Sequence, residues 1–332
     1  MKRAVMLLTL LIAPLFAADW NPRLAADYLD SREKEWFAWP HANQNAHPCV
    51  SCHTNMTYLM ARPALRRALD ENGPTRYETG LLATLSSRVG STSPAQMYPT
   101  AKGVFAEQET GVEAIFAALF LPDSPEAFER MWKLQTPNGA WAWNSADLDP
   151  WETPESEYFG AALAAIAATR ENDSRFVANV AALQKYLRDG LHQQPLQNRL
   201  MALWASSLMK DLLPKSVRSG ILKDAYRAQQ PDGGWTAASL GRFKSHPTAP
   251  PQPGSNAYAT AFTTFVLERA DVSRFDAHLE KGLAWLGSHQ NPQTGAWEAL
   301  SFNKKYEPGS MQIRFMQDAA TGFAVMALLD VR

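Results

Sequence analysis

The sequence has little charge and few cysteines. Of its 332 residues, 20% are charged, and 33 Asp and Glu nearly balance 32 Lys and Arg, for a net charge of −1. This composition excludes an acidic disordered tail and a basic nucleic-acid-binding protein. The 18 Gly and 22 Pro follow no Gly-x-y period, which excludes a collagen-like chain. A hydrophobic fraction of 46% is enough for a large core.

Long apolar runs are also missing, except at the N-terminus. There Lys2 and Arg3 precede an apolar stretch at 4–16, which is followed by two alanines. The stretch is shorter than the roughly 20 residues that span a bilayer, and the arrangement is typical of a secretory signal. We therefore predict a signal peptide at 1–17 and one mature domain at 18–332, in the bacterial periplasm or otherwise exported, without a transmembrane segment. An N-terminal anchor or a buried helix is the alternative.

The only two cysteines form the motif Cys49-Val-Ser-Cys52-His53. Two thiols separated by two residues and followed by His are the attachment pattern of a c-type haem. Each thiol forms a thioether with a haem vinyl group, and the imidazole ligates the iron. Such a haem agrees with export. We predict one covalent haem c on Cys49, Cys52 and His53, with His53 as the proximal iron ligand, in a loop at about 40–56.

Three other uses of the cysteine pair stay open. A redox dithiol is typical of a thioredoxin-like βαβ context, which this sequence does not show. A zinc site needs further ligands, for which His41 and His47 are nearest. A structural disulfide is stable after export. If the haem has a distal iron ligand, another segment must supply it, and the candidates are Met97, Met311, Met316 and His246.

One turn motif occurs three times in the second part of the chain. It reads QTPNGAW at 135–141, QQPDGGW at 229–235 and QNPQTGAW at 290–297. In each copy a Gly lies two residues before the Trp, where a tight turn favours positive φ, and a Pro restricts the entry into the turn. A degenerate copy at 190–195 fits the spacing between the first two.

Each turn separates two kinds of predicted helix. The helices before the turns are amphipathic and are expected at 22–36, 76–89, 124–134, 174–189, 214–229 and 274–289. The helices after the turns are apolar and rich in small residues, and are expected to begin near 56, 109, 157, 196, 256 and 318. Six such pairs predict an all-α protein, either closed into an (α/α)6 barrel with the apolar helices inside or stacked as an open solenoid.

The three turns resemble the QW motifs of squalene-hopene and oxidosqualene cyclases, whose α/α toroid also occurs in protein prenyltransferase β subunits. The resemblance covers about residues 120–332. It implies an (α/α)6 toroid in which the Gln and Trp of the turns stabilise the fold. The catalytic features of these families are missing, because the chain has no Asp-x-Asp-Asp acid and its cysteines belong to the haem motif. The nearest acidic string is Asp147-Leu-Asp149.

Polar residues at the starts of the inner helices are expected at one rim of the barrel. Their ordinary role is to cap helices and to compensate helix dipoles. Together they are also candidates for an acidic mouth of a pocket. The candidate catalytic residues at this rim and in the nearby loop are Asp147, Asp149, Glu157 and Asp318.

Three functions are compatible with these features. The first is an exported haem c redox protein that passes electrons to a bound apolar, isoprenoid-like molecule or, as a haem-dependent oxidoreductase, oxidises it. The second is an electron-transfer or sensing module with a redox partner protein and a scaffold toroid. The third is a terpene cyclase with a structural haem. An open sixth position on the iron favours an enzyme or sensor, and a saturated iron favours electron transfer.

Overall fold

The computed structural model describes residues 20–44, 47–91, 104–145, 148–243 and 247–329. Within these ranges the regular structure is helical, apart from one antiparallel pair of two-residue strands, β1 (Asn43–Gln44) and β2 (His47–Pro48). The all-α class predicted from the sequence is confirmed. The predicted signal peptide at 1–17 and three candidate residues lie outside the described residues: Met97, Asp147 and His246.

The long helices follow the order expected from the repeats. The amphipathic set is α1 (Pro22–Ala38), α3 (Arg76–Arg88), α6 (Pro125–Lys133), α8 (Val177–Gly190), α10 (Lys215–Ala228) and α13 (Ala277–Ser288). The apolar set is α2 (Asn55–Ala68), α5 (Val104–Phe120), α7 (Ser156–Ala168), α9 (Leu196–Leu208), α12 (Ala257–Arg269) and α14 (Phe315–Leu328). Shorter segments are η1 (Ser174–Phe176), η2 (Leu191–Gln193), α11 (Ala237–Leu240) and η3 (Met311–Arg314).

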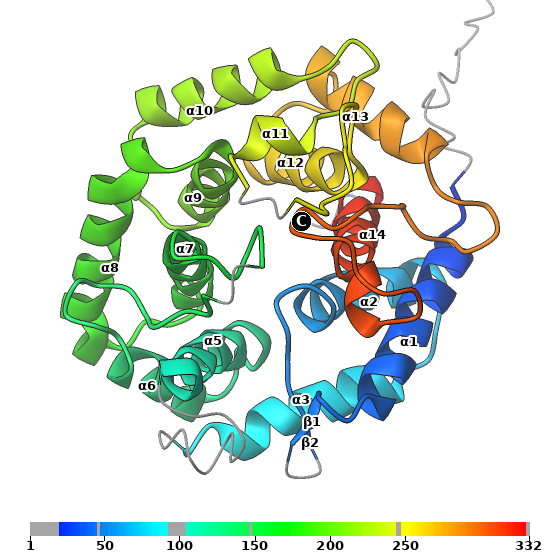
Figure 1. Cartoon of the computed structure of the whole chain (residues 1–332). Coiled ribbons are helices and arrows are strands. Elements are labelled where there is room, and N and C mark those ends of the chain that lie inside the picture. Colours follow the sequence, from blue (N-terminus) through cyan, green and yellow to red (C-terminus); the bar gives the residue numbers. More distant parts are fainter. Residues whose placement is uncertain (1–19, 45–46, 92–103, 146–147, 244–246, 330–332) are drawn as a thin grey trace, which may run out of the picture.

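The two sets of helices form two layers around a common centre (Figure 1). The apolar set lies nearer the centre, and the amphipathic set lies outside it. Burial follows this division. In α7 every residue except Glu157 is buried, whereas in α8 only Leu183 and Leu187 are. The hydrophobic effect therefore places the small-residue helices inside, where alanine allows the backbones to approach closely.

The first and last helix pairs of the described chain lie side by side. Helix α14 packs against α2 and α1 as well as against α12. The amide group of Gln290 donates to the carbonyl oxygen of Asn21 at 3.0 Å, and its oxygen accepts from the Asn21 N–H at 2.5 Å. The rings of Trp20 and Trp297 are 5.8 Å apart. These contacts link the start of the described chain to its last turn.

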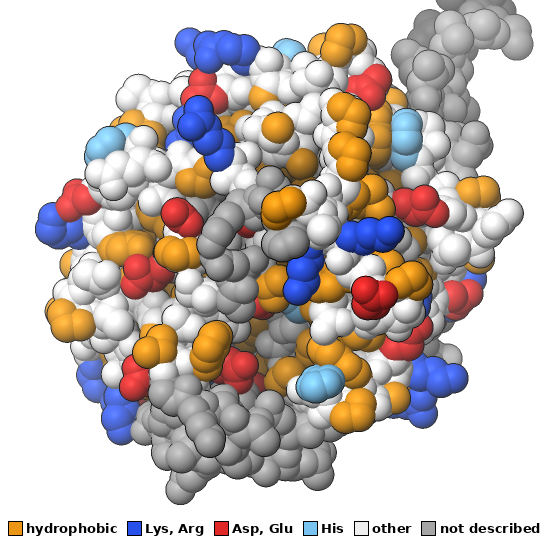
Figure 2. Space-filling model, in the orientation of Figure 1, with side chains coloured by type: hydrophobic (Ala, Val, Ile, Leu, Met, Phe, Trp, Pro, Cys, Tyr) orange, Lys and Arg blue, Asp and Glu red, His pale blue; other side chains and the backbone are white. Residues whose placement is uncertain are grey.

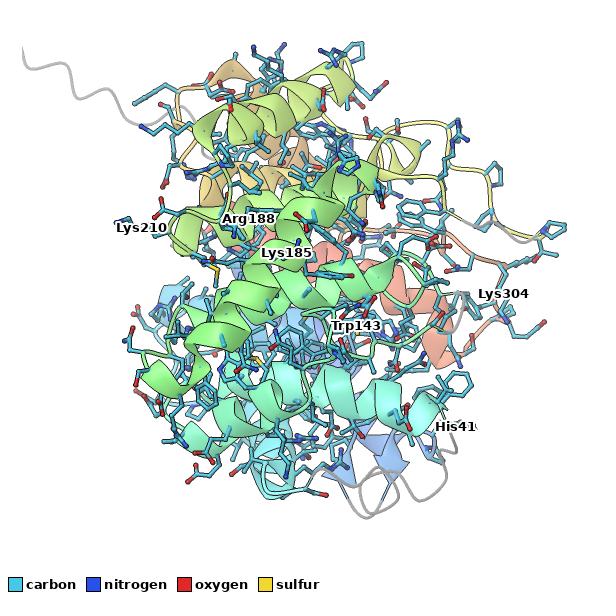
Figure 3. The ribbon with its side chains drawn as sticks, turned by 90° about the vertical axis from the view of Figure 1, so that its left-hand side faces the viewer. His41, Trp143, Lys185, Arg188, Lys210 and Lys304 are labelled. Carbon is cyan, nitrogen blue, oxygen red and sulfur yellow. The ribbon has the colours of Figure 1, made fainter. Side chains whose placement is uncertain are left out.

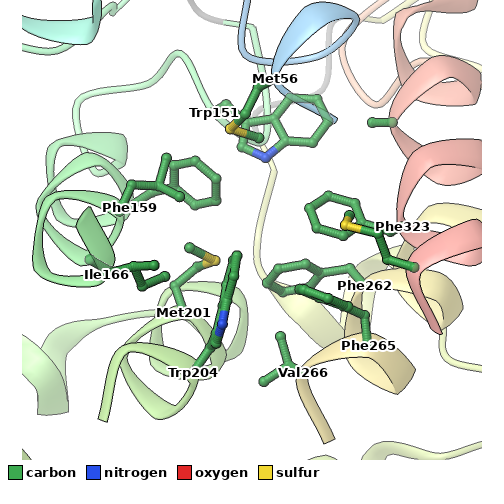
Figure 4. Close-up of a cluster of buried hydrophobic side chains, with 14 of the residues drawn as sticks. Met56, Trp151, Phe159, Ile166, Met201, Trp204, Phe262, Phe265, Val266 and Phe323 are labelled. Atoms are coloured by element: carbon green, nitrogen blue, oxygen red, sulfur yellow. The ribbon is translucent and has the colours of Figure 1, made fainter. Parts of the chain in front are cut away.

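Large apolar side chains of the inner helices point toward the centre (Figure 4). The rings of Trp204 and Phe265 are 4.9 Å apart, and those of Phe262 and Phe323 are 5.2 Å apart, both pairs edge to face. All four side chains are at most 5% exposed. Aromatic pairs in this geometry add about 0.5–1.5 kcal/mol each beyond the burial of their surface. Contacts between these aromatic rings thus help to hold the inner helices together at the centre.

The three Gln-Gly-Trp turns repeat one hydrogen-bond pattern. In each turn the Gln amide donates both to the turn glycine and to a carbonyl oxygen at the start of the next outer helix. The acceptors in the next helix are Asn179, His278 and Asn21. The Trp indole donates back to the preceding outer helix, at Met131, Ala225 and Leu286. Each turn therefore joins two outer helices, and the last joins α13 to α1.

Gly295 makes the closest contact between such a turn and the next helix. Its φ is +79°, and a Cβ there would lie 2.1 Å from the carbonyl oxygen of Leu24. A left-handed backbone costs an L-residue about 1–2 kcal/mol, and the clash adds to this cost. We expect Gly295→Ala to lower the free energy of unfolding by more than about 2 kcal/mol, measured by urea denaturation.

Gly309 is the matched control for this substitution. Its φ is +81°, but an added Cβ would meet no atom within 4 Å. Gly309→Ala therefore isolates the backbone strain. If the two variants lose the same stability, the last turn does not make the close contact with α1 described above.

Candidate functional site

The cysteine motif lies between α1 and α2 and is held by hydrogen bonds on both sides. Before the motif, the Cys49 N–H donates to the carbonyl oxygen of Ala42 at 2.7 Å. The indole N–H of Trp36 donates to the Cys49 carbonyl oxygen at 2.9 Å. Within the motif, the N–H and hydroxyl of Ser51 donate to Oδ1 of Asn55, in the first turn of α2. The motif is thus fixed against the N-terminus of an inner helix.

The two thiols are unpaired, and Cys49 is half-buried while Cys52 is buried. Cys49 and Cys52 are both free cysteines, and Cys52 is only 1% exposed. Burial raises the pKa of both thiols well above the usual range, and the Glu109 carboxylate raises it further. Both side chains are therefore neutral thiols at physiological pH, without the reactivity of an activated thiolate.

His53 follows the second thiol and is buried, with 7% of its surface exposed. Its Nε2 lies 3.3 Å from Oε1 of Glu152, and its Nδ1 is buried without a hydrogen-bond partner among the described residues. The ring of Phe315 stacks on the imidazole, with centroids 3.9 Å apart and an angle of 10° between the planes. This face-to-face contact fixes the plane of the imidazole.

A small cavity of about 20 Å³ borders His53. A cavity of this size has room for about one water molecule. Its walls come from the segment before α7, the segment before α14 and the first turn of α14. They include Asp149, Trp151, Asn303, Phe315 and Met316.

Carboxylates surround the two thiols. Glu113 forms a buried ion pair with Arg88, and Oε2 of Glu109 is buried without a hydrogen-bond partner in the described part of the chain. Burial, followed by the charges of Glu113 and Glu152, raises the pKa of Glu109 to about 7. Glu109 therefore changes its charge near neutral pH.

The titration of Glu109 predicts a pH dependence of stability. Glutamate titrates near 4.3 in an unfolded chain and near 7 at this position, so the folded state binds the extra proton between these values. This contribution to stability is complete below about pH 4 and is lost as the pH rises through 7. We expect the free energy of unfolding of Glu109→Gln, relative to wild type, to increase from pH 5 to pH 8, measured by urea denaturation.

Glu107, which is exposed on the same helix, provides the control for this prediction. Glu107→Gln changes the charge equally but removes no buried carboxylate. A relative stability of Glu109→Gln that is the same at pH 5 and pH 8 would show that the carboxylate titrates as an ordinary surface glutamate.

Two of the candidates from the sequence lie beside His53. Asp149 and Met316 both line the small cavity. Oδ2 of Asp149 accepts a hydrogen bond from Asn303 at 3.1 Å. Met311, another candidate distal ligand, does not line this cavity. It packs in a hydrophobic cluster with Trp36 and Phe315. The packing of α14 against α2 brings these segments together.

The other two described candidates are held in hydrogen bonds. Glu157 accepts from the Tyr186 hydroxyl at 3.3 Å. Asp318 is fully buried: its Oδ1 accepts from Tyr28 and from Arg32, both at 2.7 Å, and its Oδ2 accepts from Thr54 at 2.8 Å. Asp318 thus links α14 to α1 and to the residue that follows His53.

Sequence reasoning missed the two side chains in closest contact with the imidazole, Glu152 and Phe315. Each lies just before or at the start of an inner helix, as the motif does. Their position at the start of an inner helix is the only sequence signal that could have pointed to them. Nothing in their local sequence distinguishes them from the other polar and aromatic residues at the same rim.

The donor types, two thiols and an imidazole, are those of a c-type haem. The cavity of about 20 Å³ beside His53 is far smaller than a porphyrin, so the side chains that border it would have to move apart for the group to bind. Two unpaired thiols and a buried imidazole lie within one turn of backbone, and Phe315 stacks on the face of the imidazole ring. One ring nitrogen of His53 would ligate the iron, and if that nitrogen is Nε2, its contact with Glu152 would be lost. Within the described ranges, no three His, Cys, Asp or Glu side chains are grouped to hold a metal ion by themselves.

Comparisons with known proteins add no family. No protein-family model matches the chain, and no curated protein matches it. Within the described ranges, every helix is too short or too polar to cross a bilayer. The face of the molecule that carries the starts of the inner helices shows acidic and basic side chains interspersed, without a large patch of one sign (Figure 2).

Proposed function

We propose that this chain is an exported c-type haem protein that transfers electrons. The haem is held covalently by Cys49 and Cys52, and His53 is the proximal ligand of its iron. When bound, the haem supplies a one-electron ferric/ferrous couple. The observation that carries the proposal is the buried imidazole that directly follows two unpaired thiols.

The surrounding side chains support this assignment. Phe315 sets the plane of the imidazole, and Trp36 holds the Cys49 carbonyl oxygen at the start of the motif. Low exposure of Cys52 and His53 keeps water from the attachment site. A dry, aromatic surrounding is one of the means by which proteins adjust the potential of a haem.

The scaffold we propose is an (α/α)6 toroid of the type found in squalene-hopene cyclases and prenyltransferase β subunits. Two observations support it. The hydrogen bonds of the three Gln-Gly-Trp turns repeat residue by residue, and the last turn reaches from α13 back to α1. The predicted signal at 1–17 and the need to attach haem c outside the cytoplasm support export to the periplasm.

Electron transfer is favoured over oxidation of a molecule held in the centre of the helices. Rings that point to the centre contact one another, as Trp204 contacts Phe265 and Phe262 contacts Phe323. An apolar substrate there has to displace these contacts. Cyclase chemistry by Asp318 is disfavoured, because its two oxygens accept three hydrogen bonds, one of them from the Arg32 guanidinium. Such an aspartate stabilises helices and does not protonate an alkene.

Absorption spectra of the protein, produced in a host that matures c-type haem, test the proposal. We expect a haem that stays with the polypeptide in acidified acetone and gives the pyridine adduct of a haem with two thioethers. Carbon monoxide then tests the sixth position: weak binding by the ferrous protein agrees with electron transfer, and tight binding favours an enzyme or sensor. A colourless protein from that host excludes the proposed function.

A further inference from the structure

A row of aromatic rings leads from His53 to the molecular surface. The imidazole stacks on Phe315 at 3.9 Å, Phe315 lies 6.4 Å from Trp39, and Trp39 lies 5.2 Å from His41, measured between ring centroids. Trp36 makes a second branch, 6.5 Å from His53 and 5.4 Å from Trp39. His53 is buried, Trp39 is half-buried and His41 is exposed. Both branches therefore meet at Trp39 on their way to solvent.

The other ring beside His53 leads in a different direction. Trp151 lies 6.2 Å from the imidazole and 5.0 Å from Tyr258, which is fully buried in α12. Tyr258 in turn stacks on Phe262, among the rings at the centre. The contacts through Trp151 thus continue into the core, and the contacts through Trp39 continue outward.

The outer end of the row borders a surface pocket of about 590 Å³. One wall contains Glu35, Trp39 and His41, and the other is the segment 309–314. His41 lies at the same end of the molecule as Lys304, on the face seen in Figure 1, and Lys210 lies toward the opposite end (Figure 3). The pocket is therefore open to a molecule that approaches the end carrying the cysteine motif.

We propose that Trp39 relays single electrons between the site at His53 and a small one-electron carrier in this pocket. The inference rests on the haem function proposed above. Aromatic π systems in close contact replace long steps through aliphatic side chains by short ones, and Trp39 is the ring at which both branches converge. One electron leaves the reduced protein and one carrier ion accepts it; no bond forms or breaks, and no proton moves.

Stopped-flow oxidation of the reduced holoprotein by ferricyanide tests the relay. Ferricyanide accepts one electron and becomes ferrocyanide. We expect Trp39→Leu to slow the reaction several-fold and Trp39→Tyr to restore much of the rate, because tyrosine keeps an aromatic ring in the path. The absorption spectrum and the midpoint potential are expected to stay at their wild-type values, since the ring contacts described above join Trp39 to Phe315, Trp36 and His41.

The matched control is Trp285→Leu. Like Trp39, Trp285 contacts a histidine ring, that of His289 at 3.8 Å, and lines a surface pocket, here of about 560 Å³, but it lies on α13 away from the motif. Its replacement is expected to leave the rate unchanged. In the haem-free protein, acrylamide quenching of tryptophan fluorescence checks the partial exposure of Trp39, since Trp39→Leu should lower the quenchable fraction.

The outcomes separate this inference from the function on which it rests. If the wild-type protein carries no covalent haem, both are overturned. If the haem is attached and Trp39→Leu reacts as fast as wild type, only the relay is overturned. A loss of rate together with a shifted midpoint potential also overturns it, because Trp39 then acts on the haem site and not on the path.

Discussion

The double substitution of Cys49→Ala and Cys52→Ala is expected to abolish covalent haem attachment. A thioether needs the sulfur of each cysteine, and the chain has no other cysteine to replace them. After extraction with acidified acetone, the wild type should keep its haem and the double variant should lose it completely. Each single variant should keep one thioether, which the pyridine adduct distinguishes by the wavelength of its main band.

Two further variants separate attachment from folding. Val50→Ala shortens a buried side chain between the thiols and should keep the full haem content. His53→Ala should keep both thioethers but change the spectrum, because the iron loses the imidazole. The proposal is wrong if the double variant retains acid-resistant haem, or if Val50→Ala loses haem as the double variant does.

The sequence predicted the helices well because their patterns are local. Alanine-rich stretches such as α7 differ in composition from charged stretches such as α8, and the Gly and Trp of each turn mark its place in the sequence. The positive φ angles of Gly139, Gly233 and Gly295 follow from the same local chemistry. The hydrogen-bond partners of the turns could not be predicted from the sequence. The carbonyl groups that accept from their glutamines belong to the next outer helix, and packing alone decides which carbonyls lie there.

The candidate site shows the same division. The thiols and His53 are recognised from five residues, because attachment chemistry requires that spacing. The partners of His53 come from segments far along the chain: Glu152 before α7 and Phe315 at the start of α14. Local sequence does not encode these contacts. They arise because several inner helices begin at one end of the molecule.

Asp318, which lies at that end of the molecule, supports a large prediction. It was a candidate acid, but its carboxylate is fully buried and receives hydrogen bonds from Tyr28, Arg32 and Thr54. Asp318→Ala leaves the Arg32 guanidinium, itself 1% exposed, without this buried partner. Breaking a buried pair in this way costs about 3–5 kcal/mol, and we expect that loss in the free energy of unfolding by urea denaturation.

Two control variants show whether the loss of stability in Asp318→Ala comes from the charge of the carboxylate, from its shape, or from the removal of any aspartate. Asp318→Asn keeps the shape and one acceptor oxygen, so it should lose less stability than Asp318→Ala. Asp189→Ala removes an aspartate from the exposed pair with Lys185, where the expected loss is below about 1 kcal/mol. If Asp318→Ala is as stable as Asp189→Ala, the carboxylate does not hold α14 to α1. If Asp318→Ala keeps its stability but loses a cyclase activity, Asp318 acts as a catalytic acid and not as a structural residue.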